Sequence, residues 1–452
     1  MNIIIVGYGK VGQKIAERIS EEKEHNITVV DVRAGKLEDM VGQYDVMGVI
    51  GSGANIETLR EAGIENADLL IAVTGSDELN LLTCLIARKC GKCQTIARVR
   101  KPEYFKEIQL FKDDLGLAMI INPELTAATE IARLLRFPSA VQIDTFAKGR
   151  VEILKFRVSE DSVLDSIKVS DIRSRLDCDV LICGVERADD AFIPGGDFEL
   201  KGGDLVSIVS STENASHFFK KIGVKTNKVK DTMIVGGGDT AYYLAHQLIK
   251  SGIRVKLVEQ NTQRCEELCD LIPKAEIING DGTNNNLLLE VGLEQAESFV
   301  ALTNIDEENV LLSLFARKRM SGKVVTKINR IAYDDVISEL NLDSTIYPKN
   351  LTAEYIVRFV RAKKNSIGSN IETMHYILDG KAEALEFKIS ERSPVSDIMI
   401  ENLSLKPNII IASINRNGSI IIPRGKDMIK AGDTVVIITT TKGFKDIGDI
   451  LK

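Results

Sequence analysis

The sequence predicts an α/β protein with two doubly wound parallel-sheet domains, each followed by a small α+β domain. Three observations lead to this fold class: the second half of the chain repeats the first, strand-like and helix-like segments alternate, and a glycine-rich turn opens each half. The chain has 452 residues, of which 44% are hydrophobic and 27% charged. This is an ordinary globular composition, and it excludes an intrinsically disordered chain.

The two halves are copies of one unit of about 220 residues. The opening segment IIIVGYGKVGQKIAERI has a counterpart in TMIVGGGDTAYYLAHQLI, with Gly7 and Gly236 lying 229 positions apart. The offset holds over about 200 residues, with small slips near Pro123 and Pro348, which indicates a duplication. Further identical pairs at this offset are Gly9 and Gly238, Gly51 and Gly280, Thr74 and Thr303, Asp77 and Asp306, Asn80 and Asn309, Pro194 and Pro423, Gly203 and Gly432, and Asp204 and Asp433.

The first part of each unit alternates apolar strands with amphipathic helices. Its nearly continuous apolar runs are typical of parallel strands that are covered on both faces. Between the first two runs, Val11, Ile15 and Ile19 recur four residues apart, which predicts a helix. In the first copy the predicted strands are Ile3–Val6, Ile27–Val30, Val46–Ile50, Leu69–Val73 and Thr95–Val99.

The second part of each unit has a different character, that of a small α+β module of about 80 residues. Ile153–Val158 alternates apolar and charged residues, and Leu205–Val209 follows a Gly-Gly-Asp turn. Their counterparts in the second copy are Leu385–Ile389 and Val435–Ile438. We therefore expect four domains joined by a central linker within Gly223–Asp231, namely residues 1–136, 137–222, 229–364 and 370–452.

The first glycine motif is Gly7-Tyr8-Gly9-Lys10-Val11-Gly12, and it lies between a predicted strand and a predicted helix, as a Rossmann-like dinucleotide site requires. Gly7 permits the tight turn, Gly9 lets a pyrophosphate approach the backbone, and Gly12 lets helix and strand pack closely. The positive end of the helix then faces the phosphates. Asp31 ends the second strand 24 residues after Gly7, where an acid accepts from ribose hydroxyls.

The second motif is Gly236-Gly237-Gly238-Asp239-Thr240-Ala241, a G-x-G-x-x-A variant, with Glu259 as its acid. The alternative for either motif is a turn that binds nothing, and it has more weight in the second unit because duplicated sites often lose their ligand. The acids favour an unphosphorylated ribose, hence NAD over NADP, but do not separate NAD from ATP or ADP. No P-loop motif is present, which argues against P-loop hydrolysis.

Composition narrows the functional class. The formal net charge of −7 argues against a general nucleic-acid binder, and no apolar run approaches the ~18 residues of a membrane span. Seven scattered cysteines suit a reducing compartment, and the apolar N-terminal run is interpreted as a buried strand, not a signal peptide, so we expect a soluble cytoplasmic protein. Cys90 and Cys93 lack partner ligands, and the four histidines lack triad companions, so no metal site and no catalytic residue is predicted.

Arg98 lies at the end of the fifth predicted strand and Arg100 follows it, where the phosphates of a ligand would lie; a solvated strand end is the alternative. The small modules are poor candidates for a catalytic domain, and no acid or base for hydride transfer is visible. These features favour a nucleotide sensor. The alternatives are an NAD-dependent oxidoreductase with a duplicated Rossmann domain, and a scaffold with vestigial pockets.

The ordered strings closely resemble the TrkA family, the cytoplasmic regulatory subunits of bacterial Trk potassium uptake systems. The resemblance covers essentially the whole chain as two RCK (KTN) domains, each followed by an RCK C-terminal domain. It implies a non-enzymatic gating protein that binds NAD(H) and ATP or ADP and assembles in rings under a membrane potassium channel subunit. The strings are GYGKVG, VVD, AVTGSDELN, ARVRKPEY and GDLVSIV, with VGGGDTA, ALTNIDEEN and NRIAYDDVI in the second copy.

The resemblance also assigns site residues. It places the first site at Gly7–Val11, Asp31, Val73, Thr74 and Arg98, and the second at Gly236–Thr240, Glu259, Leu302 and Thr303. The copies differ in two places. The second keeps an acidic turn with Asp281, where the first has Gly51-Ser52-Gly53-Ala54, and Arg98 and Arg100 become Lys327 and Asn329. We therefore expect the first site to prefer ATP over ADP and the second to prefer the dinucleotide.

Two nucleotide domains per chain, in a family whose rings contain eight, imply a homotetramer held at the inner face of the membrane by its channel partner. Two helical stripes are candidates for the assembly surface, and intradomain core is the alternative for both. The stripes are Leu125, Ala128, Ile131, Ala132 and Leu135, and Ile356, Val357 and Val360.

Overall fold

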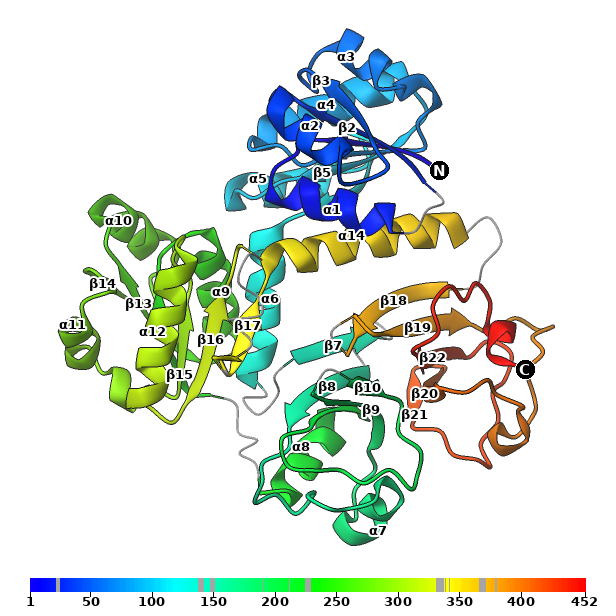
Figure 1. The fold of residues 1–452 in the computed structure, drawn as a ribbon. Helices are drawn as coiled ribbons and strands as arrows, with labels where there is room; N and C mark the ends of the chain where they lie inside the picture. The colour runs from blue at the N-terminus through cyan, green and yellow to red at the C-terminus, as the bar shows by residue number, and fades with distance from the viewer. Residues whose placement is uncertain are drawn as a thin grey trace. The chain divides into compact units, whose positions relative to one another are not determined.

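The structure is a computed structural model, shown as a ribbon in Figure 1. It divides into two compact units, and each takes one segment from each half of the sequence. The first unit is Met1–Ala132 with Lys230–Val357, and the second is Arg133–Val229 with Arg358–Lys452. The described residues are 1–21, 25–136, 142–146, 151–188, 190–210, 212–223, 229–330, 337, 339–340, 342–365, 371–378 and 380–452.

The first sheet is parallel, with the strand order β3-β2-β1-β4-β5-β6 that the doubly wound prediction requires. The order reverses between β1 and β4, which creates the crevice where ligands bind in such folds. Its strands are β1 (Asn2–Val6), β2 (Asn26–Asp31), β3 (Met47–Ile50), β4 (Leu69–Ala72), β5 (Gln94–Arg98) and β6 (Leu117–Ile121). Its helices are α1 (Lys10–Ser20), α2 (Ala34–Val41), α3 (Ile56–Glu61), α4 (Asp77–Cys90), α5 (Pro102–Phe111) and α6 (Pro123–Arg136).

Both faces of this sheet are covered, as its apolar strands predict. Ile4 and Val6 of β1 belong to a core cluster that includes residues of α3 and α4, while Ile3 and Ile5, on the opposite face, are also buried. The predicted stripe of α1 is buried in full. The alternation of side chains along β1 therefore supplies apolar groups to two layers of helices.

The second sheet repeats this topology with the order β14-β13-β12-β15-β16-β17. Two repeated side chains explain why the sequence offset is kept. Asn80 and Asn309 each accept from the amide of the threonine six residues earlier at 2.8 Å and donate to the carbonyl that ends the next strand. The elements are β12 (Asp231–Val235), β13 (Arg254–Glu259), β14 (Glu276–Asn279), β15 (Ser298–Ala301), β16 (Lys323–Lys327), β17 (Ser344–Ile346), α9 (Asp239–Lys250), α10 (Thr262–Leu271), α11 (Asn285–Glu290), α12 (Asp306–Arg319) and α14 (Pro348–Asn365).

The second unit contains two five-stranded antiparallel sheets, ordered β10-β9-β11-β8-β7 and β18-β19-β22-β20-β21. Each has an Arg–Asp pair at the same place, Arg187 with Asp204 and Arg416 with Asp433. The elements are β7 (Gln142–Phe146), β8 (Val151–Arg157), α7 (Ile172–Leu176), β9 (Leu181–Arg187), β10 (Asp190–Phe192), β11 (Leu205–Ser210), α8 (Thr212–Lys221), β18 (Ile371–Ile377), β19 (Ala382–Lys388), β20 (Ile409–Arg416), β21 (Ser419–Ile421) and β22 (Thr434–Thr439).

The helical stripes are covered within the single chain. Ala128 and Ile131 of α6 and Ile356 of α14 are 0% exposed. Part of the surroundings of α6 comes from the other nucleotide-type domain, since Gln247 of α9 donates to the hydroxyl of Thr129 at 3.1 Å. Residues 224–228 of the expected linker, the domain limits at 137 and 370, and residues 331–336 of the NRIAYDDVI string lie outside the described residues. In the part of the chain that the structure describes, no helix is long and apolar enough to cross a membrane.

Candidate functional site

The first glycine turn has the geometry that the motif predicts. Gly7 has φ +102°, and its N–H donates to the carbonyl of Val30 at 2.7 Å. A Cβ atom at Gly7 would lie 2.9 Å from the backbone of Thr74, and one at Gly12 would lie 1.9 Å from the carbonyl oxygen of Gly7. At Gly9, by contrast, an added Cβ meets no atom within 4 Å. Gly7 and Gly12 are therefore required by the fold, whereas Gly9 leaves open space for a ligand.

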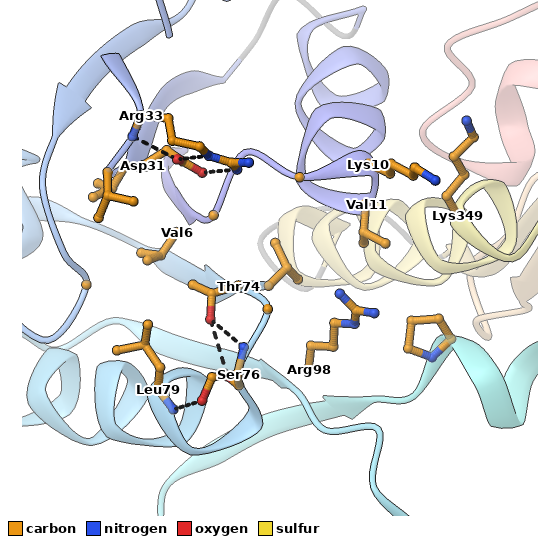
Figure 2. A pocket seen from close by; sticks show the side chains of 18 of the residues that line it. Val6, Lys10, Val11, Asp31, Arg33, Thr74, Ser76, Leu79, Arg98 and Lys349 are labelled. Atoms are coloured by element: carbon orange, nitrogen blue, oxygen red, sulfur yellow. Dashed lines mark hydrogen bonds and ion pairs between the residues drawn. The ribbon is translucent and has the colours of Figure 1, made fainter. Parts of the chain in front are cut away.

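This turn leads into a pocket of about 560 Å³, seen from close by in Figure 2. Helix α1 begins after Gly9 without any side-chain cap, so its first amides point toward this space. Most residues predicted for the first site line the pocket, whereas Tyr8 and Gly12 support the turn from behind it. The predicted residues that line it are Gly7, Gly9, Lys10, Val11, Asp31, Val73, Thr74 and Arg98.

Asp31 lies at the end of β2 and is buried, with 6% of its surface exposed. Its Oδ2 accepts from the N–H of Tyr8 at 2.6 Å, and its Oδ1 accepts from the backbone N–H of Arg33 at 3.0 Å. The Arg33 guanidinium donates to both oxygens, at 2.8 Å and 3.0 Å. Burial alone would raise the pKa of Asp31, but the hydrogen bonds from Arg33 and Tyr8 outweigh it and lower the pKa to about 2.

Arg98 lies at the other end of the pocket and is largely buried. One of its terminal nitrogens is 3.4 Å from Oε1 of Glu124, the second residue of α6. The Arg98 Nε and the Glu124 Oε2 are buried without a hydrogen-bond partner among the described residues. Burial lowers the pKa of Arg98, although Glu124 acts in the opposite direction. An unsatisfied buried donor of this kind at a pocket wall fits an anionic ligand group.

Two further cations line the same pocket as Arg98. Figure 2 shows Lys10 of α1 and Lys349 of α14 on the same side of the pocket as Arg98, away from Asp31 and Arg33. Lys349 comes from the second half of the sequence, and it lies close to this pocket because both nucleotide-type domains belong to one compact unit. Sequence reasoning missed Arg33, Glu124 and Lys349, and no local motif marks any of them.

Arg100, also predicted for the first site, contacts other groups. It does not line the pocket; its guanidinium donates to the carbonyl of Gly75 at 2.5 Å and lies 3.4 Å from Asp77. The carboxylate of Asp77 also accepts from the backbone N–H groups of Arg100 and Lys101. Asp77, the first residue of α4, thus fixes the chain after β5 and pairs with Arg100 outside the pocket, unlike Arg98, which lines it.

The second glycine turn repeats the first. Gly236 has φ +100°, and a Cβ atom there would lie 2.8 Å from the backbone of Leu302. Gly238 faces open space, and α9 begins after it with no side-chain cap. Asp239 and Thr240 form the first turn of α9. The predicted residues Gly236, Gly238 and Leu302 therefore lie together as in the first copy.

The acid of the second turn is held differently from Asp31. Glu259 accepts from the backbone N–H groups of Gly237 and Asn261, each at 2.7 Å. Arg264 of α10 donates to the carbonyl of Gly237 at 2.8 Å and lies 3.4 Å from Asp239, so it braces the turn rather than the acid. No contact between Arg264 and Glu259 occurs among the described residues.

The phosphate end of the second copy has little free positive charge. Lys327, at the position of Arg98, is buried and donates to the carbonyl of Leu302 at 3.0 Å, and burial lowers its pKa. Asp281 is exposed, and the backbone and hydroxyl of Thr283 donate to it at 2.8 Å, which lowers its pKa. Thr303 donates its N–H to Asn309. The second copy thus has a lysine bonded to a backbone carbonyl where the first has Arg98, and it has an exposed carboxylate, Asp281, where the first has Ser52.

The described residues contain no cluster of three or more potential metal ligands. Together, the fold and the two turns define a protein with tandem Rossmann-type nucleotide-binding domains and two small α+β modules. The TrkA-N domain model matches residues 3–123 and 232–348, and the TrkA-C domain model matches residues 153–223 and 384–452. The chain belongs to the TrkA family.

Relatives support this membership over the full length. The Trk system potassium uptake protein TrkA homolog 1 of Methanosarcina mazei is 30% identical, with 100% of both chains covered. The Trk system potassium uptake protein TrkA of Haemophilus influenzae is 32% identical, covering 100% of this chain and 98% of its own. Among solved structures, the GsuK channel bound to NAD has a TM-score of 0.62 at 18% identity, covering 97% of this chain and 77% of that one. The GsuK RCK domain has a TM-score of 0.63 at 18% identity, with 97% and 92% covered. These structures share the fold, which confirms the predicted fold class.

Proposed function

We propose that this chain is the nucleotide-sensing regulatory subunit of a Trk-type potassium uptake system, and that it binds nucleotides without catalysing a reaction on them. Relatives of the same length are named Trk system potassium uptake proteins. Structures of similar fold are described as bound to NAD and to ADP. These names support the class of ligand, and the first pocket supports the ligand's orientation.

The observation that carries the proposal is the first pocket. Its uncapped helix end, Gly9 and Asp31 form a phosphate and ribose site, and Arg98 stands beyond them with an unsatisfied buried Nε. In our proposal the ribose lies toward Asp31, the first phosphates lie over Gly9, and the terminal phosphate points to Arg98 and Lys349. Three cations oppose Glu124 at that end, so we expect ATP to bind more tightly than ADP.

The second site has the complementary preference in our proposal. Lys327 is committed to the carbonyl of Leu302, and Glu259 and Asp281 add negative charge. Extra terminal phosphate charge is therefore disfavoured, and we propose NAD(H) as its ligand. The uncapped end of α9 still binds the pyrophosphate.

Regulation requires that a nucleotide bind two arrangements of the protein with different affinity, because only that difference shifts the equilibrium between them. Since the described chain contains no membrane-spanning helix, we propose that it acts at the cytoplasmic face by docking on a membrane potassium channel subunit. Two nucleotide domains per chain fit a homotetrameric ring of eight domains. We propose domain limits at residues 1–136, 137–222, 229–364 and 370–452.

The test uses two matched variants, Gly9→Val and Gly238→Val, because a Cβ atom added at either position points into open space, with no atom of the rest of the protein within 4 Å. The chain is reconstituted with its channel subunit in liposomes, and potassium flux is recorded while ATP, ADP, NAD and NADH are titrated. We expect Gly9→Val to remove the ATP response and Gly238→Val to remove the NAD(H) response. Absence of binding for all four nucleotides, or steady NADH oxidation with candidate substrates, would contradict the proposal; the latter favours the oxidoreductase.

A further inference from the structure

The carboxylate of Asp31 is saturated by the chain itself. A carboxylate offers about four lone-pair positions in its plane. In this structure, Arg33 Nε and the Arg33 backbone N–H donate to Oδ1, at 2.8 Å and 3.0 Å. Tyr8 N–H and an Arg33 terminal nitrogen donate to Oδ2, at 2.6 Å and 3.0 Å. A ribose diol that approaches Asp31 therefore meets an acceptor whose positions are already filled.

The second copy provides an internal comparison. Both glycine turns have an arginine near the carbonyl of their middle residue: Arg264 donates to Gly237 at 2.8 Å, and Arg33 lies 3.4 Å from the carbonyl of Tyr8. The two arginines differ in their relation to the acid. Arg264 leaves Glu259 with two backbone donors, one on each oxygen, whereas Arg33 takes both oxygens of Asp31.

We propose that Arg33 is a specificity-determining residue of the first site that competes with the ribose hydroxyls of a nucleotide for Asp31. This inference rests on the proposed function, in which the first pocket binds a nucleotide. The Arg33 side chain is 50% exposed and lines the pocket, so it has room to turn into solvent. Each bound diol must replace two guanidinium hydrogen bonds, so hydroxyl recognition contributes less to affinity at Asp31 than at Glu259.

The consequence is a difference in ligand choice between the two copies. The first site recognises mainly phosphate, through the end of α1 and Arg98, and distinguishes poorly between ligands with and without ribose hydroxyls. The second site, whose acid keeps open positions, distinguishes them well. The two copies therefore rely on different parts of a nucleotide: the first copy has the phosphate-binding cations and a blocked ribose acceptor, and the second copy has the open ribose acceptor.

The experiment compares ATP with 2′,3′-dideoxy-ATP by calorimetry on the full chain carrying Gly238→Val, so that the heat comes from the first site. We expect the ratio of the two affinities to rise about tenfold on Arg33→Met, since the diol then gains a free charged acceptor. Arg33→Lys, which keeps the charge without the planar fork, should give an intermediate ratio. The matched control is Arg60→Met; Arg60 pairs with Glu57 on α3 outside the pocket, and its removal should leave the ratio unchanged.

Use of a ratio separates competition from general electrostatics. Loss of one positive charge weakens both triphosphates equally, and this effect cancels. An unchanged ratio in Arg33→Met would overturn the inference, and so would a fall in the ratio, which would make Arg33 a direct ligand of the hydroxyls. Both results leave the proposed function standing, because ATP still binds. A protein with Arg33 in place that binds neither triphosphate refutes the proposed function itself.

Discussion

Replacement of Asp31 by asparagine tests whether this acid supports the glycine turn as well as a ligand. From the sequence alone, removal of Asp31 should leave the fold intact, since an acid at a strand tip lies outside the core. The structure corrects that expectation: Asp31 is buried, and it holds the N–H of Tyr8 and the guanidinium of Arg33. Asparagine offers one acceptor oxygen, and its amide group faces donors, so at least one of these bonds is lost.

The size of the stabilisation by Asp31 follows from the shift of its pKa. The pKa of Asp31 falls from 3.8 to about 2, and one pKa unit corresponds to about 1.4 kcal/mol, so the ionised carboxylate stabilises the folded first domain by about 2.5 kcal/mol. Because the folded-state pKa is depressed, this stabilisation is fully present above pH ~4, where the unfolded-state acid is also ionised. It is lost as the pH falls from about 4 through about 2, where the folded-state acid takes up its proton.

Hydrogen exchange of the peptide that contains Tyr8 measures the local free energy of opening at the glycine turn. A local measurement is needed because a chain of several domains does not unfold in one step. At pH 7 we expect Asp31→Asn to lower the free energy of opening by about 2 kcal/mol. The control is Asp281→Asn in the second copy, where the exposed acid holds only its own turn and the change should stay below about 0.5 kcal/mol. Equal protection of the Tyr8 peptide in the parent and in Asp31→Asn would refute the reasoning.

Two further predictions follow from the positions of side chains. Arg98→Ala should weaken ATP binding by about tenfold or more and NAD binding less. Arg100→Ala should leave both affinities nearly unchanged and should loosen the start of α4, because Arg100 contacts Asp77 there. Calorimetry measures the affinities and hydrogen exchange the loosening; a larger loss of ATP affinity in Arg100→Ala than in Arg98→Ala would contradict the assignment. Ile131→Asp should give insoluble or unfolded chain instead of smaller nucleotide-binding species, because Ile131 is 0% exposed. The control Leu110→Asp on α5 should be tolerated, because Leu110 is 76% exposed. Sedimentation and circular dichroism distinguish these outcomes, and a folded monomer of Ile131→Asp would support the assembly-surface alternative.

The fold was predictable because its signals are local and repeated. Apolar runs bounded by turns identify the strands, and the helix stripe of Val11, Ile15 and Ile19 is buried as its spacing indicates. The glycine positions were also predictable, since a strand–turn–helix junction determines which residue needs a positive φ and which needs open space. Gly7 and Gly9 meet these two requirements. The repeat adds a second signal: the role of Asn80 could be inferred from its counterpart in the other copy.

The orientation of the charged side chains was not predictable, because it depends on partners that are distant in the sequence. Arg98 and Arg100 are two residues apart on the same strand end, yet one meets Glu124 in the pocket and the other turns to Asp77. Lys349 lies beside the first pocket although it belongs to the other half of the chain. No local sequence pattern indicates which carboxylate forms an ion pair with which guanidinium group.

The partners of the cations explain how one duplicated turn can serve two ligands. The backbone of both turns is nearly the same, so the amides that bind phosphate are common to both. In the first copy the buried cation, Arg98, keeps an unsatisfied Nε for a ligand, while the acid is occupied by Arg33. In the second copy the buried cation, Lys327, is satisfied by a backbone carbonyl, and the acid is not taken by an arginine. In the function that we propose, side chains alone exchange phosphate recognition and ribose recognition between the copies, and the chain has two sensors with different responses on one fold.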